Sequence, residues 1–111
     1  SDWLDSEFVM TDYGHRGIPN VFLTAPLKSD GTWNSANFQN AEYDQLVTDY
    51  VAALDLDAQK DAAGKIQRLL LDETPIIFPY FYNWLTATAP NVAGVQPTAM
   101  GQLFLQTATV G

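Results

Sequence analysis

The chain of 111 residues has the length of one ordinary domain, and its 47% hydrophobic and 13% aromatic content excludes a disordered chain. Its net charge of −8, with only 5 Lys and Arg residues, argues against binding to nucleic acid or to an anionic membrane. The absence of cysteine excludes disulfide bonds, thiolate catalysis and Cys-based zinc sites.

The first part of the chain predicts a strand, a short helix and a long loop. Residues 7–13 (EFVMTDY) are rich in β-formers and predict a strand, and residues 14–19 follow as a loop with two glycines and a proline. Residues 20–27 predict a short helix, and the polar stretch 28–40 predicts a loop. The loop carries two aromatic side chains that are candidates for burial: Trp33 and Phe38.

Two helices are predicted in the middle of the chain, each with an apolar stripe at the helical period. The stripe of the first helix is Tyr43, Leu46, Val47, Tyr50, Val51 and Leu54, and that of the second is Ala58, Ala62, Ile66, Leu69 and Leu70. We expect Asn40 to cap the first helix and Asp57 to cap the second. Pro75 should end the second helix because it biases Thr74 towards extended geometry. The short link between them predicts an antiparallel hairpin over 41–74.

Charged residues of the second predicted helix lie four positions apart. Two pairs of opposite charge are expected to face solvent there: Asp61 with Lys65, and Arg68 with Asp72. Such exposed pairs contribute only tenths of a kcal/mol, so we interpret them as features of a solvated helix face.

The last part of the chain predicts two or three strands. Residues 76–82 (IIFPYFY) are nearly continuously apolar, which is typical of a buried strand, although Pro79 requires an edge, a bulge or a break in pairing. Residues 84–89 alternate and either continue this strand or pair with it, and residues 103–110 are the last strand candidate. The fold class is therefore mixed α and β (α/β).

Several short segments occur in a characteristic order. Trp33-Asn34 precedes the helix pair, residues 38–46 (FQNAEYDQL) lead into the first helix, residues 66–77 run from IQ to TPII, and residues 91–95 read NVAGV. Together they resemble the C-terminal portion of extracytoplasmic solute-binding proteins of ABC importers, in the peptide/nickel (oligopeptide/dipeptide-binding) family. The resemblance covers nearly the whole chain and rests on order and spacing rather than on one motif.

The resemblance implies a two-lobed, type II periplasmic-binding-protein-like fold, of which residues 1–111 form a single partial domain. Residues 1–75 would belong to the second lobe, residues 76–89 to the crossover, and residues 90–111 to the return into the first lobe. The implied parent protein is several times longer, lies at the periplasmic or extracellular face of the membrane, and is either free or lipid-anchored. It would bind a peptide or another small solute, close its lobes and dock on the membrane permease of the importer.

The resemblance implies a ligand site near the end of the first predicted strand. Oligopeptide-binding members have an Ala-Asp-Tyr sequence whose Asp pairs with the α-amino group of the peptide, and here Thr11 precedes Asp12 and Tyr13. The alternative is a strand-end Asp that accepts hydrogen bonds from loop N–H groups. Arg16 is a candidate clamp for a ligand carboxylate, or else an exposed loop residue. The family often continues with Asp-Pro, whereas this chain reads GHRGIP.

Aromatic residues form a second group of candidates. Tyr80, Tyr82 and Trp84 lie in the implied crossover, where they would line the ligand cleft, and Trp33 on the long loop is a further candidate. The alternative for all four is core packing, which is the commoner fate of aromatic side chains.

Enzymatic readings find no support in the sequence. Residues 55–61 begin like a calcium-binding loop, but Lys60 stands at its sixth position and Ile66 at its twelfth, where Gly and Glu are needed. We therefore expect no enzyme, no cofactor and no metal site. The alternative to a solute receptor is a stand-alone interaction module, and we expect the isolated chain to self-associate through exposed strands.

Overall fold

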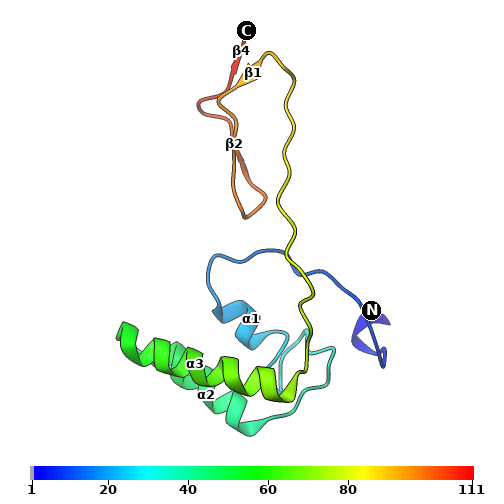
Figure 1. The fold of residues 1–111 in the computed structure, drawn as a ribbon, viewed down its shortest axis with the longest axis vertical. Helices are drawn as coiled ribbons and strands as arrows, with labels where there is room; N and C mark the ends of the chain where they lie inside the picture. Colours follow the sequence, from blue (N-terminus) through cyan, green and yellow to red (C-terminus); the bar gives the residue numbers. More distant parts are fainter. Residues whose placement is uncertain (1) are drawn as a thin grey trace. The chain divides into compact units, whose positions relative to one another are not determined.

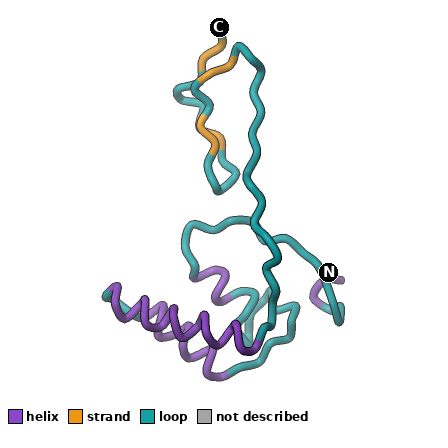
Figure 2. The backbone as a smooth tube through the Cα atoms, viewed as in Figure 1, coloured by secondary structure: helices purple, strands orange, loops and turns teal. Residues whose placement is uncertain are grey.

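The computed structural model describes residues 2–111. Its helices are η1 (Asp2–Leu4), a short 3-10 helix, followed by α1 (Asn20–Thr24), α2 (Ala41–Ala52) and α3 (Leu56–Glu73), as Figure 1 shows. Its strands are β1 (Val92–Ala93), β2 (Gln96–Pro97), β3 (Leu103–Phe104) and β4 (Thr109–Val110). Figure 2 shows how much of the chain is loop. The mixed α and β class is confirmed, because helices and small antiparallel sheets are both present.

The chain divides into two compact units. The N-terminal unit comprises the described residues up to Asp12 together with Ile18–Ile77, and the C-terminal unit comprises Tyr13–Gly17 with Phe78–Gly111. The buried hydrophobic side chains all belong to the N-terminal unit: Leu27, Tyr43, Val47, Ala62 and Ile66. The assignment of segments to two lobes, which the resemblance implies, stays a prediction.

Helices α2 and α3 form the predicted antiparallel hairpin. Asn40 caps α2 as expected, because its Oδ1 accepts a hydrogen bond from the Tyr43 N–H at 3.0 Å. The cap expected at Asp57 is wrong. Asp55 has the extended backbone of a cap residue, and its Oδ1 accepts from the Ala58 N–H at 2.9 Å. Asp57 already lies within the first turn of α3, where its charge suits the positive end of the helix dipole.

The C-terminal end of α3 differs from the expected geometry. The helix ends at Glu73, as Pro75 predicts, but the extended conformation expected for Thr74 is wrong. Thr74 is left-handed, with φ 48° and ψ 52°, and its N–H donates to the Leu70 carbonyl at 2.9 Å. Its Oγ1 donates to the Leu71 carbonyl at 2.9 Å. A left-handed cap satisfies carbonyls at the helix end, and this gain offsets the preference imposed by the following proline.

The core lies where α1, α2, α3 and the intervening loop meet. Tyr43 and Ile66 are 0% and 2% exposed, and Val47 and Leu27 complete the buried cluster. The Tyr43 hydroxyl donates to the Leu23 carbonyl at 2.7 Å, which ties α2 to α1. Partly buried apolar residues surround this cluster: Leu23, Phe38, Leu46, Tyr50, Leu69, Leu70 and Ile76. Both predicted apolar stripes therefore contribute to the core.

Polar contacts hold the loop between α1 and α2 in place. The predicted short helix ends at Thr24 rather than at residue 27. The Asp44 carboxylate accepts the Ser29 N–H at 3.0 Å, and the Asn34 side chain exchanges hydrogen bonds with the Phe38 backbone at 3.0 and 2.8 Å. Gly31 packs so closely that a Cβ there would lie 2.8 Å from the Thr24 carbonyl oxygen. Main-chain packing thus requires glycine at this point of the loop.

The C-terminal unit contains two small antiparallel sheets. Val92 faces Val110 where β1 pairs with β4, and Gln96 faces Phe104 where β2 pairs with β3. The turn between β2 and β3 closes with the Gly101 N–H donating to the Thr98 carbonyl at 3.0 Å. None of the described side chains of this unit is buried.

The structure corrects most of the predicted strands. Residues 7–13, 76–82 and 84–89 form no strand, and the strand predicted over 103–110 appears only as the short pieces β3 and β4. The burial expected for the apolar run 76–82 is also wrong, since Tyr80 and Phe81 are 73% and 89% exposed. Strand propensity requires a partner for the main-chain hydrogen bonds, and no described segment supplies one to residues 77–88.

Candidate functional site

The implied ligand residues around position 12 belong to different units. Asp12 is exposed at the end of the first stretch of the N-terminal unit. Tyr13 and Arg16 belong to the C-terminal unit, and both are half-buried. The Arg16 Nη1 donates to the carbonyls of Gly14 and His15 at 3.0 and 3.1 Å, so these bonds fold the guanidinium back over its own loop. Asp12 lies outside any helix or strand, and its role in ligand binding stays a prediction.

Trp33 lies on the ordered loop of the N-terminal unit. Its side chain is half-buried, and its backbone N–H donates to the Ala25 carbonyl at 2.9 Å. The neighbouring Asn34 donates to the Lys28 carbonyl at 3.2 Å as well as to Phe38. Trp33 therefore has a firmly held backbone, but it is not among the buried core residues.

An exposed aromatic strip runs through the start of the C-terminal unit. We define this strip as residues 78–85, and its apolar members are Phe78, Tyr80, Phe81, Tyr82, Trp84 and Leu85. The rings of Phe78 and Phe81 stack with centroids 6.2 Å apart and planes 15° apart. The core alternative is wrong for Tyr80, Tyr82 and Trp84, which are 73%, 60% and 55% exposed.

Trp84 is a member of the strip that contacts a distant segment of its own unit. A Cβ on Gly101 would lie 2.8 Å from the Trp84 ring, so the indole covers the turn between β2 and β3. Gly101 also has φ +73°, a conformation that favours glycine. One side of the strip thus contacts its own unit, while Phe81 and Leu85 remain 89% and 86% exposed.

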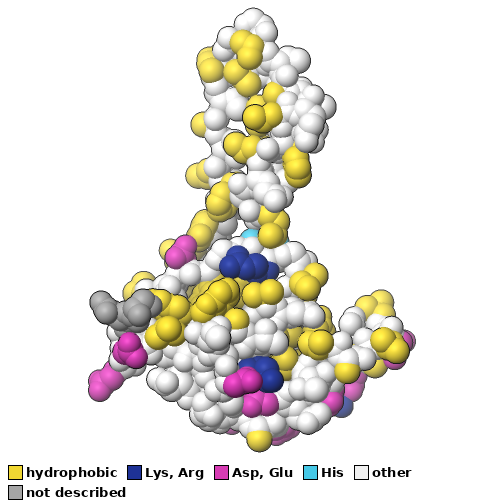
Figure 3. All heavy atoms as spheres, turned by 180° about the vertical axis from the view of Figure 1, so that it is seen from behind, with side chains coloured by type: hydrophobic (Ala, Val, Ile, Leu, Met, Phe, Trp, Pro, Cys, Tyr) yellow, Lys and Arg dark blue, Asp and Glu magenta, His cyan; other side chains and the backbone are white. Residues whose placement is uncertain are grey.

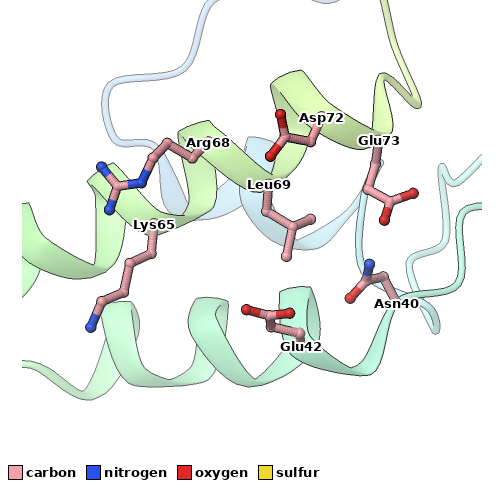
Figure 4. Close-up of a pocket in the computed structure, with 7 residues that line it drawn as sticks. All are labelled: Asn40, Glu42, Lys65, Arg68, Leu69, Asp72 and Glu73. Atoms are coloured by element: carbon pink, nitrogen blue, oxygen red, sulfur yellow. The ribbon is translucent and has the colours of Figure 1, made fainter.

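A shallow polar hollow of about 350 Å³ lies between the start of α2 and the second half of α3. Figure 4 shows Lys65 and Arg68 extending to one side of it, whereas the carboxylates of Glu42, Asp72 and Glu73 lie towards the other, around Leu69. Lys65 pairs with Asp61 at 2.6 Å, as expected, but the predicted pair of Arg68 with Asp72 is wrong within the described part of the chain. The sequence alone does not reveal this hollow, because opposed side chains of two helices meet only after the hairpin forms.

Two structural observations bear on metals and membranes. No three His, Cys, Asp or Glu side chains among residues 2–111 lie close enough together to hold a metal ion. No helix in the described chain combines the length and the apolar content needed to cross a bilayer.

A curated protein is similar to most of the present chain. The chain is 30% identical over 88 residues to the dipeptide-binding protein DppE of Bacillus subtilis. The match covers 79% of this chain but 16% of the relative, so this chain spans only a small part of that protein's length. No protein-family model matches the chain, and no solved structure matches it significantly.

Proposed function

We propose that this chain is part of the solute-binding component of an ABC importer, and that the component binds peptides outside the cytoplasm. The observation that carries the proposal is the 30% identity over 88 residues to a dipeptide-binding protein. The order of the segments from Trp33 to Val95, which resembles that of peptide-binding solute receptors, is consistent with this proposal. In this role the whole component captures the solute and delivers it to the membrane permease, and the chain performs no catalytic step.

The exposed residues fit such a role chemically. A carboxylate at Asp12 supplies an opposite charge and hydrogen-bond acceptors for the α-amino group of a peptide. Tyr80 and Tyr82 offer apolar ring faces that can contact many different side chains, and neither ring is packed into the core. The other proposed ligand residues are the half-buried Tyr13, Arg16 and Trp33 and the exposed Trp84.

The test is calorimetric titration of the complete product of the reading frame with alanyl-alanine and with its N-acetylated form. We expect binding of the free dipeptide, and weaker binding of the acetylated one because it lacks the ammonium group. Asp12→Asn should lower the affinity for the free dipeptide by about tenfold or more, since it removes a charge-assisted hydrogen bond.

The matched control is Asp57→Asn, which removes an equal charge from a side chain that is 96% exposed. This variant should bind like the unchanged protein. Absence of any peptide binding would contradict the proposed function. Binding that Asp12→Asn leaves unchanged would contradict only the role of Asp12.

A further inference from the structure

The charged side chains of this protein are confined to one part of the sequence. All 13 acidic and all 5 basic residues lie between Asp2 and Glu73, so residues 74–111 carry no charge. Figure 3 shows the same division on the visible face, where the segment that carries the strands displays only hydrophobic and uncharged atoms. The whole net charge of −8 therefore belongs to residues 1–73.

The aromatic strip and the residues after it expose an unpaired main chain. Residues 77–88 lie outside every helix and strand, and their N–H and C=O groups make no hydrogen bond to any part of the chain that the structure describes. Extended main chain of this kind is a template for strand pairing. Exposed strand edges are usually protected by charged residues, above all Lys, and this stretch has none.

The side chains of the strip leave one side open. Phe81 and Leu85 are 89% and 86% exposed, while Tyr82 and Trp84 are 60% and 55% exposed. The more covered set includes Trp84, whose ring rests on Gly101. The open side is apolar and continuous with the unpaired main chain, so a partner strand would bury both at once.

We propose that two copies of this chain associate through residues 80–88, which pair as antiparallel strands about a twofold axis near Trp84. A twofold contact brings the same surface together on both copies, and an uncharged apolar strip is complementary to itself. Two chains of charge −8 repel wherever their residues 1–73 meet, and the uncharged segment is the surface on which they can approach without like charges facing each other. A partner that binds through ion pairs would need charged residues on the strip, and the strip has none.

This inference does not depend on the proposed role in transport. It concerns the association of the 111-residue chain itself, and its test contains no peptide. A failure of peptide binding would leave it standing, and a monomeric chain would leave the transport proposal standing.

The test is sedimentation equilibrium of the purified 111-residue chain over a wide range of concentration. We expect a reversible monomer–dimer equilibrium. Leu85→Lys places two positive charges near each other across the axis and should raise the dimer dissociation constant at least about tenfold. The control Leu54→Lys introduces the same charge at a fully exposed leucine in the link between α2 and α3, and should leave the dimer unchanged.

Charge exchange separates a specific contact from a folding defect. Leu85→Glu alone should also weaken the dimer, whereas an equimolar mixture of Leu85→Lys and Leu85→Glu should restore it, because opposite charges then meet across the axis. A chain that stays monomeric at every concentration would overturn the proposal, even if it bound a further polypeptide of a longer parent. Open-ended oligomers, no restoration by the mixture, or equal weakening by Leu54→Lys would also overturn it.

Discussion

The two units of this protein are similarly supplied with apolar residues and use them differently. In the N-terminal unit, Tyr43, Val47 and Ile66 are at most 2% exposed. In the C-terminal unit no described side chain is buried, although the aromatic strip holds more large apolar residues than the core cluster. The difference lies in the main chain: helices satisfy their own hydrogen bonds and need only one covered face, whereas strands need neighbours.

Hydrophobicity alone does not place a residue in the core of this protein. Helices α2 and α3 bring their stripes together through a link of three residues, Ala53, Leu54 and Asp55. Residues 77–88 have no comparable local partner, and the paired strands β1 to β4 are only two residues long. Much of the C-terminal unit therefore leaves its apolar side chains exposed and its main chain without hydrogen bonds, whereas the N-terminal unit buries its own core.

The largest effect is expected from the core. Ile66→Ala should lower the free energy of unfolding by roughly 2–5 kcal/mol, because it removes buried methyl groups and leaves a cavity. Leu85→Ala is the matched change in the C-terminal unit and should stay within about 0.5 kcal/mol when measured on the monomer. Urea unfolding followed by helix circular dichroism measures both. Equal losses in the two variants would show that Leu85 is packed as tightly as Ile66, contrary to the difference between the units.

A smaller effect is expected from the hydroxyl that joins α2 to α1. Tyr43→Phe should cost about 1–2 kcal/mol, because the Leu23 carbonyl loses its 2.7 Å hydrogen bond inside the core. The same urea titration measures this change. A loss indistinguishable from zero would show that water or another donor replaces the hydroxyl.

The same phenol gives the N-terminal unit a dependence on alkaline pH. Burial, with a smaller contribution from the Asp44 carboxylate, raises the pKa of Tyr43 well above its usual value of 10.0. The folded pKa exceeds the unfolded one, so stability is complete below about pH 10 and decreases above it, where the unfolded chain releases the proton first. Tyr43→Phe should flatten this decrease, because phenylalanine carries no ionisable group at this buried position.

The smallest effect is expected at the N-terminal cap of α3. Asp55→Ala should destabilise the N-terminal unit by about 1 kcal/mol, because it removes the side chain that caps α3. Asp57→Ala should cost about 0.5 kcal/mol or less, since that residue contributes only its charge near the helix dipole. A reversed order of the two losses would mean that α3 begins two residues later than the structure shows.

Local sequence patterns predicted the helical half well. The stripes from Tyr43 to Leu70 repeat at the helical period, and a helix is specified by residues three and four positions apart. The cap at Asn40 and the end of α3 before Pro75 follow from equally local chemistry. The choice between Asp55 and Asp57 did not, because both are acidic cap residues two positions apart and the hairpin link decided which one lies outside the helix.

The candidate site was less accessible to sequence analysis. The aromatic side chains of the strip were open to either burial or exposure, and only the structure shows that Tyr80, Tyr82 and Trp84 remain exposed. The absence of charge after Glu73 is visible in the sequence and points to the same surface. Its meaning depends on which side chains are exposed, and periodicity alone does not determine that.

The sequence by itself determined the helix pair and the cap at Asn40, because both depend on neighbours within a few residues. Tertiary structure decided which apolar residues are buried, that residues 7–13 and 76–89 form no strand, and that a charged hollow lies between α2 and α3. Strand pairing and side-chain burial join residues distant in sequence, and they form only where another segment supplies both apolar cover and hydrogen-bond partners.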